Sequence, residues 1–288
     1  MIRYLATCLL CLLSILATDA NSQEVIKIQS PKSEDNLSHR YFVDLLTLIL
    51  QETKHDYGEV KLVQVDGTVS QSRGFSMLTR GSLDVFWAGT NVQREARFSA
   101  IKVPLIGGLL GYRMPVIRYQ DADKFGEITQ ATQLQSLVAC QGAQWPDSDI
   151  LELNQYHVTR VITFGLIYEM LEQGRCDYFP RGLNEVYPEV AGKPDLVAFE
   201  NILLHYPLPM YFFTSKGKPQ LSKRLNKGMQ KLVESGDLIE FIENHPTTRD
   251  IFPLTRYSGS HIFELNNPLL PPNTETNNAA MWLTIPRH

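Results

Sequence analysis

The alternation of apolar and polar positions in the first third of the chain predicts strands and helices in turn. Residues 24–29 and 60–65 alternate like half-buried strands, and residues 84–88 form a continuous apolar run typical of a strand covered on both faces. Residues 39–54 place apolar side chains at intervals of three and four, as one helix face does: Phe42, Leu45, Leu46, Ile49 and Leu50. With a second helix expected at 68–79, the pattern predicts a parallel sheet covered by helices.

The same pattern restarts after a glycine-bearing segment. Gly107, Gly108 and Gly111 precede an extended run that ends near Ile117, which suits a hinge or crossover between two bodies. The next strands are expected at 136–141, 160–164 and 176–179, and the helices between them at 147–155 and 165–173. Extended segments within 197–215 and helices over 220–235 and 238–244 follow. The chain therefore reads as an α/β protein made of two similar units.

The N-terminus has the pattern of a secretory signal peptide. Arg3 precedes an apolar run over 5–17, which is shorter than the roughly 20 residues that span a bilayer, and small residues follow at 17–20. We predict a signal peptide over residues 1–20 and a periplasmic location, with an N-terminal membrane anchor as the alternative. No later apolar segment is long enough to predict a membrane span after processing.

Composition narrows the possible partners. The formal net charge is −4 and no basic stripe is present, so a nucleic acid is not an expected partner. Two of the four cysteines, Cys8 and Cys11, fall in the predicted signal peptide. The other two, Cys140 and Cys176, are expected on neighbouring parallel strands, offset by two or three residues of about 3.3 Å each. That offset exceeds disulfide geometry, and we predict that these cysteines do not pair.

Catalytic and metal-binding patterns are missing from the sequence. It contains no Gly-x-Ser-x-Gly, no His-Glu-x-x-His and no phosphate-binding loop, and its histidines are scattered without ligand spacing. Asp147 and Asp149 lie at a predicted helix start, where the helix dipole explains them. Trp87, at the end of its strand, is expected in the core. We predict no metal and no cofactor.

Several motifs, in order, carry a family resemblance. Residues 78–84 (LTRGSLD) and 171–177 (LEQGRCD) each resemble the "L-x-x-G-x-x-D" segment of the family 3 periplasmic solute-binding proteins. Residues 90–105 and 218–237 resemble that family's threonine–arginine–proline run and its C-terminal helix, so the resemblance covers about 24–245. It implies the two-lobed type II periplasmic-binding-protein fold, each lobe a mainly parallel sheet with flanking helices, joined by crossover hinge strands. We expect lobe 1 to comprise 23–108 plus 214–288, and lobe 2 to comprise 109–213.

The resemblance implies an anion clamp on the first lobe. In the family, the arginine that matches Arg94 holds a ligand carboxylate, and a threonine matching Thr90 accompanies it. A guanidinium suits this role because its rigid fork meets two carboxylate oxygens at once. The alternatives are that Arg94 is a solvated loop arginine, or that Arg97 is the clamp.

The second lobe departs from the family. Amino-acid binders usually carry an acidic residue just past the second-lobe strand, where it pairs the ligand ammonium, but the matching place here holds Gly182, beside Arg181. We expect Arg181 to attract a second anion, with Glu185 as the nearest acidic candidate. Gln144 is expected to hydrogen-bond the ligand, and Trp145 either stacks on it or packs on the lobe surface.

These patterns predict a monomeric periplasmic solute-binding protein and not an enzyme. Its ligand is expected to be small and anionic or zwitterionic, similar to an amino acid, and to be passed to the permease of an ABC transporter or to a sensor. The alternatives are a secreted enzyme or an orphan signalling module on the same scaffold. The segment 258–288 is rich in apolar residues, and we expect it to be docked on the first lobe rather than solvated.

Overall fold

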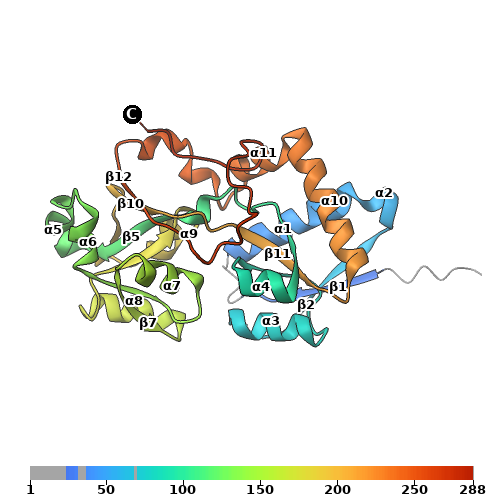
Figure 1. Ribbon diagram of the computed structural model, residues 1–288, viewed down its shortest axis with the longest axis horizontal. Coiled ribbons are helices and arrows are strands. Elements are labelled where there is room, and N and C mark those ends of the chain that lie inside the picture. Colours follow the sequence, from blue (N-terminus) through green and yellow to red (C-terminus); the bar gives the residue numbers. More distant parts are fainter. Residues whose placement is uncertain (1–23, 32–36, 68–69, 288) are drawn as a thin grey trace, which may run out of the picture.

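The computed structural model describes residues 24–31, 37–67 and 70–287, which form two lobes side by side (Figure 1). The predicted signal peptide over 1–20 lies outside the described residues. None of the described helices combines the length and apolar character needed to cross a membrane. The mixed α/β class expected from the sequence is confirmed.

Lobe 1 begins with the predicted strand–helix–strand unit. Strands β1 (Glu24–Gln29) and β2 (Val60–Val65) pair in parallel over six residues and have the bounds that the alternation predicted. Helix α1 (Leu37–Glu52) and the short helix α2 (Lys54–Tyr57) connect these strands. The apolar face of α1 is buried. Here the local pattern was sufficient because β1, α1 and β2 are consecutive in the chain.

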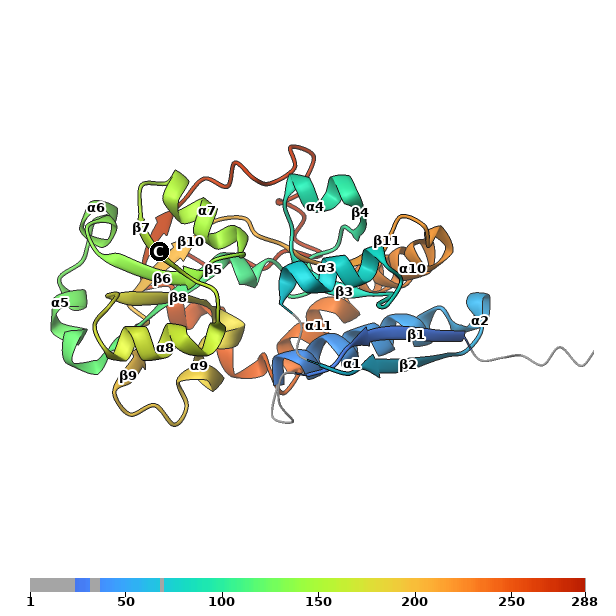
Figure 2. The same cartoon turned by 90° about the horizontal axis from the view of Figure 1, so that it is seen from below.

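A second, three-stranded sheet completes lobe 1. Its order is β3 (Phe86–Gly89), β11 (Met210–Ser215) and β4 (Phe98–Ile101), with β11 antiparallel to both neighbours. The expected neighbour relation between β1 and β3 is present only just before β3, where the Asp84 and Val85 N–H groups donate to the Lys27 carbonyl of β1. The antiparallel pairing of β3 with β11, a strand that returns from far along the chain, was not expected. Besides α1 and α2, this lobe contains four helices that Figure 2 shows from below: α3 (Gln71–Thr79), α4 (Val92–Arg97), α10 (Pro219–Ser235) and α11 (Asp237–Asn244).

Lobe 2 is built on a seven-stranded sheet of order β12-β10-β5-β8-β6-β7, with β9 also beside β5. The strand bounds are β5 (Tyr112–Arg118), β6 (Val138–Gly142), β7 (His157–Val161), β8 (Tyr178–Gly182), β9 (Leu196–Ala198), β10 (Ile202–His205) and β12 (His261–Glu264). The helices are α5 (Ala122–Gly126), α6 (Ala131–Gln135), α7 (Pro146–Leu153), α8 (Phe164–Glu172) and α9 (Leu183–Val190). Strand β5 runs antiparallel to β8, β9 and β10, whereas β6 is parallel to β7 and β8.

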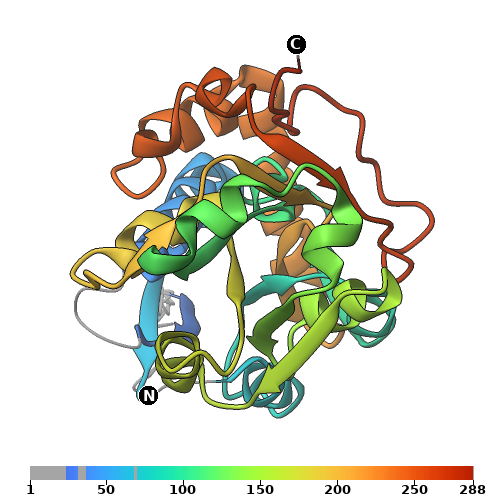
Figure 3. The same cartoon turned by 90° about the vertical axis from the view of Figure 1, so that its left-hand side faces the viewer.

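The C-terminal segment is docked, but not on the first lobe alone as expected. Strand β12 pairs in parallel with β10, so this part of 214–288 belongs to the sheet of lobe 2. Four apolar side chains of the segment are buried: Leu265, Met281, Trp282 and Ile285. In Figure 3 the segment, drawn in red, runs along one side of the molecule. Strand β12 covers the edge of β10 that would otherwise be unpaired, and the sequence pattern does not reveal this pairing.

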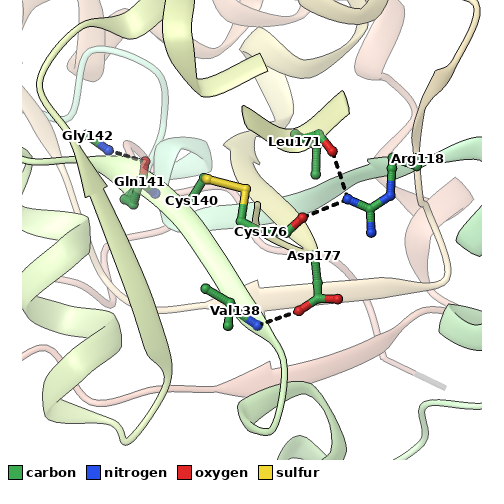
Figure 4. Close-up of a disulfide and its surroundings, with 8 residues drawn as sticks. All are labelled: Arg118, Val138, Cys140, Gln141, Gly142, Leu171, Cys176 and Asp177. Carbon is green, nitrogen blue, oxygen red and sulfur yellow. Dashed lines mark hydrogen bonds between the residues drawn. A yellow bond between two sulfur atoms is a disulfide. The ribbon is translucent and has the colours of Figure 1, made fainter. Parts of the chain in front are cut away.

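The prediction that the two mature cysteines stay apart is wrong. Cys140 and Cys176 form a disulfide with a Cα–Cα distance of 5.7 Å (Figure 4). Cys176 does not start the strand, as assumed, but lies in the turn before β8. This turn is held by Arg118, which donates to the carbonyls of Leu171 and Cys176, and by Asp177, whose carboxylate accepts the Val138 N–H. The chain bends there and removes the offset.

Candidate ligand-binding cleft

A cavity of about 780 Å³ is lined by residues of both lobes. Lobe 1 contributes mainly neutral and aromatic side chains, among them Ser38, His39, Phe42, Ser70, Gln71 and Trp87. Lobe 2 contributes the charged side chains Arg113, Asp147, Arg181, Glu185 and Glu189, together with Gln144 and Trp145. The charged residues that line the cavity therefore lie on its lobe 2 side.

Arg181 is a buried cation fixed by two carboxylates of the following helix. It lies in β8 with 4% exposure, and Glu185 and Glu189 lie four and eight residues on, along one face of α9. Its Nε and Nη2 donate to Glu189 at 2.6 and 2.7 Å, and Nη2 lies 3.1 Å from Glu185. Burial opposes its charge, but both carboxylates outweigh burial and raise the Arg181 pKa well above its usual value.

Arg181 is also enclosed by aromatic rings. Its guanidinium carbon lies 5.1, 5.4 and 4.9 Å from the ring centres of Trp145, Phe164 and Phe179. These distances suit cation–π contacts, which strengthen when water is excluded. Trp145 packs on Arg181 and also lines the cavity, so its stacking on a ligand remains an expectation.

A second buried arginine continues this network. Arg113 lies in β5 opposite Gly182 and is 2% exposed. Its Nη2 is 2.6 Å from Asp147 and its Nη1 is 3.5 Å from Glu185, so Glu185 is shared by both arginines. The Tyr206 hydroxyl also donates to Asp147, at 2.6 Å. The helix dipole is therefore an insufficient explanation of Asp147, which is 4% exposed and balances a buried arginine.

The paired state of Arg181 bears on the expectation that it binds a ligand anion. We expected it to attract a second anion, but its charge is already opposed by Glu185 and Glu189. The described residues that line the cavity include two arginines and three carboxylates, which in their usual ionised forms give a net charge of −1. The lobe 2 wall therefore carries a small net negative charge rather than the positive charge that a free Arg181 would have given it.

Arg94 lies on the other side, at the start of α4. Its Nη2 donates to Gln71 Oε1 at 2.6 Å and reaches the Gln144 carbonyl of lobe 2 at 3.5 Å, and its Nη1 donates to the Gly89 carbonyl. All three acceptors are neutral, and no carboxylate of the described residues lies within 4.0 Å of it. Burial lowers the Arg94 pKa to about 10, an effect that the charge of Asp147 partly offsets.

Thr90 and Arg97 do not line the cavity. The Thr90 side chain is fully buried, and its Oγ1 donates to Glu95 at 2.8 Å, so it braces α4. Arg97 is exposed and its guanidinium lies over the Phe98 ring. Arg94 is not among the lining residues, but Gln71, Gly89 and Gln144, to which it donates, all line the cavity. Gln144, Trp145, Arg181 and Glu185, by contrast, all line it.

The sequence analysis did not select Arg113, Asp147, Gln71 or Glu189. Glu189 could have been found, because Arg181, Glu185 and Glu189 recur at intervals of four across a helix start. Arg113 and Asp147 lie on elements 34 positions apart in the printed sequence, and no local pattern links them. Trp87, expected in the core, packs on Phe42 and Phe212 but also lines the cavity.

Comparison with known proteins identifies the fold. No protein-family model matches the chain, and no curated protein does. Solved structures do match. The periplasmic VFT2 domain of Bordetella pertussis BvgS has a TM-score of 0.60 at 16% identity, covering 77% of this chain and 93% of that one.

Two further solved structures have similar scores. An amino acid ABC transporter substrate-binding protein from Streptococcus pneumoniae, bound to L-arginine, has a TM-score of 0.54 at 20% identity over 71% of this chain and 82% of its own. An ancestral amino-acid-binding protein, a precursor of cyclohexadienyl dehydratase, has a TM-score of 0.55 at 14% identity over 77% and 95%. The chain therefore has the two-lobed fold of the periplasmic binding proteins, and its neighbours of this fold are mostly binding proteins.

Proposed function

We propose that this protein is a periplasmic solute-binding protein that captures a small zwitterionic, amino-acid-like ligand between its lobes. In this proposal Arg94 holds the ligand carboxylate, and Glu185, with Asp147 and Glu189 nearby, attracts the ammonium group. Gln144 and Trp145 contribute a hydrogen bond and an apolar wall. The observation that carries the proposal is the separation of charge: Arg94 on lobe 1 has no carboxylate partner among the described residues, and the wall on lobe 2 is net negative.

The energetic reasoning starts from Arg94. The Arg94 guanidinium is partly buried and contacts neutral acceptors, so it keeps an unfavourable desolvation energy, as its lowered pKa indicates. A ligand carboxylate would replace neutral acceptors by a charge-assisted, two-pronged pair. Because the same ligand would also meet the acidic wall of lobe 2, binding would favour the closed arrangement of the lobes.

The location and partners follow from the same proposal. A signal peptide over residues 1–20 would direct the chain to the periplasm, where the protein acts as a monomer without catalytic activity. It would present its ligand to an ABC transporter permease or to a membrane sensor. The neighbours whose names describe a transporter protein and a periplasmic domain support these two routes.

A thermal-shift screen with matched ligands tests the ligand class. L-arginine would be compared with agmatine, which lacks the carboxylate, and with N-acetyl-arginine, which lacks the ammonium; other amino acids and dicarboxylates would be screened alongside. A ligand at a hundred times its Kd stabilises a protein by about 2.7 kcal/mol. We expect stabilisation by at least one intact amino acid and by neither truncated analogue. Stabilisation by dicarboxylates alone would overturn the zwitterion proposal.

The Arg94→Ala variant tests the clamp. Loss of a charged contact in a desolvated cleft weakens binding by about 2–5 kcal/mol, to be measured by calorimetry with the ligand from the screen. Arg97→Ala is the matched control, because Arg97 is on the same short helix but exposed. Unchanged affinity in Arg94→Ala would remove Arg94 from the site, and weaker binding in Arg97→Ala would reassign the role.

An enzyme on the same scaffold is the second candidate, favoured by the neighbour described as a precursor of a dehydratase. Mass spectrometry of the ligand after prolonged incubation with the protein separates the two. Recovery of intact ligand supports a binding protein, whereas conversion that increases with protein concentration supports an enzyme.

A further inference from the structure

A pair of glycines with positive φ lies in one of the segments that pass between the two lobes. Gly107 and Gly108 have φ values of 56° and 74° and come just before β5, the first strand of lobe 2. Hinges are short stretches that absorb changes in φ and ψ when lobes move, and glycine does this with little strain. The sequence already marked this segment as a hinge.

The C-terminal segment covers this hinge. The Trp282 ring lies directly on Gly108, where an added Cβ would be 2.2 Å from the ring, and the Leu283 side chain lies on Gly107 in the same way, at 2.9 Å. The Leu283 N–H donates to the Gly107 carbonyl at 2.9 Å. Two residues further on, the Ile285 N–H donates to the Tyr112 hydroxyl at 3.3 Å. A rotation at either glycine would displace a buried tryptophan or break these bonds.

The same segment also ties the lobes together away from the hinge. On lobe 2, β12 pairs with β10, and Asn266 exchanges two backbone–side-chain hydrogen bonds with Asn154, at the end of α7. Three residues later, the Leu269 carbonyl accepts the Val92 N–H of α4, on lobe 1, at 3.0 Å. In Figure 2 the red segment passes from the region of α7 towards α4. These two helices carry Asp147 and Arg94 on opposite sides of the cleft.

We propose that residues 265–285 form a strap that restrains the opening of the two lobes. The strap contacts lobe 2 at Asn154, lobe 1 at Val92 and the hinge at Gly107 and Gly108, so the lobes cannot separate fully while all three contacts persist. The ligand-free protein therefore samples a narrow range of lobe angles. Release of the strap widens that range and accelerates ligand entry and exit. This inference does not depend on which ligand the cleft binds.

Val92→Pro is the sharpest variant. Val92 is the first residue of α4, a position where proline is well tolerated, and Asn91 before it is extended, as a residue before proline should be. The substitution removes the N–H that donates to Leu269 and leaves the helix intact. Val92→Ala is the matched control, because it shortens the side chain but retains the N–H. Trp282→Ala tests the hinge contact, with the exposed Glu275→Ala of the same segment as its control.

Double electron–electron resonance on the ligand-free, full-length protein measures the effect. Nitroxide labels at the exposed positions Asp123, on α5 of lobe 2, and Lys223, on α10 of lobe 1, report the distance between the lobes. We expect one narrow distance distribution in the wild type and in both control variants, and an added population at longer distance in Val92→Pro and Trp282→Ala. If Trp282→Ala does not fold, Val92→Pro alone decides. A broad distribution in the wild type, or an unchanged one in Val92→Pro, would overturn the proposal.

Discussion

At the scale of single residues, the buried ion network of lobe 2 shows how context changes the role of a charge. Arg181 and Arg113 are 4% and 2% exposed, and each lies against carboxylates that come from other elements. An isolated buried guanidinium would be very unfavourable, so removing one member of the network leaves the others uncompensated. Arg160 forms ion pairs with Asp149 and Glu152 at the surface, where water screens the charges and makes each pair weaker.

We predict that Arg181→Met lowers the free energy of unfolding by about 3–5 kcal/mol, because Glu185 and Glu189 then share a buried site without their cation. Arg160→Met is the control and should lower it by about 1 kcal/mol or less, as for exposed ion pairs. Urea denaturation followed by circular dichroism measures both. Equal effects in the two variants would show that burial does not distinguish the two networks.

At the scale of elements, the contact between α1 and α10 depends on one glycine. A Cβ added at Gly228 would lie 2.6 Å from the Ile49 side chain and 2.7 Å from its backbone carbonyl. The side chain could move, but the backbone of α1 could not without shifting the helix. Gly165, in α8, has open space around the same position. Alanine substitutions at these two glycines therefore distinguish the effect of helix packing from the effect of helix propensity.

Gly228→Ala should lower the free energy of unfolding by about 1–3 kcal/mol, since overpacking outweighs the gain of up to about 1 kcal/mol that alanine brings to a helix. Gly165→Ala, the control, should leave stability unchanged or raise it slightly. Thermal unfolding of the two variants side by side provides the measurement. A stabilising Gly228→Ala would mean that α1 and α10 separate easily.

The disulfide is the other element-scale feature. It closes a loop of 36 residues between β6 and the turn before β8, for which chain-entropy reasoning gives about 4 kcal/mol of stabilisation. We predict that the double variant Cys140→Ala/Cys176→Ala lowers the free energy of unfolding by about 2–4 kcal/mol. A thiol assay on the denatured, unreduced mature protein should find no free sulfhydryl, and two equivalents would contradict the structure directly.

At the scale of the whole molecule, the C-terminal segment is part of the folded unit. Burial of each of Leu265, Met281, Trp282 and Ile285 contributes about 1.5–3 kcal/mol, part of which offsets the ordering of the segment. Truncation after Tyr257 should therefore lower the free energy of unfolding by at least about 2 kcal/mol and expose the β10 edge. Truncation after Pro286, which spares all four side chains, is the control. Rapid proteolytic loss of residues 258–288 that leaves an equally stable remainder would contradict this docking.

Local patterns in the sequence determined most of the elements. Strands β1 and β2 have the predicted bounds, and helices α1, α3, α7, α8, α10 and α11 lie within a few residues of their predicted ranges. The α/β class and the restart of the pattern after Gly107 and Gly108 followed as well. These features depend on side-chain periodicity over ten to fifteen consecutive residues, which one strand or helix expresses by itself. Gln144, Trp145, Arg181 and Glu185 were selected through the family resemblance, and all four line the cavity.

Only the tertiary structure decided which distant segments meet. It placed β11 beside β3 and β12 beside β10, and it brought Cys140 to Cys176. It paired Arg113 with Asp147 and Arg181 with Glu189, so the arginine expected to be free for a ligand anion is already opposed by carboxylates. It also laid Trp282 on the hinge glycines. The physical reason is that a free strand edge, a buried charge and the space beside a glycine can each be filled by a segment from anywhere in the chain. The separation of two residues in the sequence does not determine their distance in the folded protein.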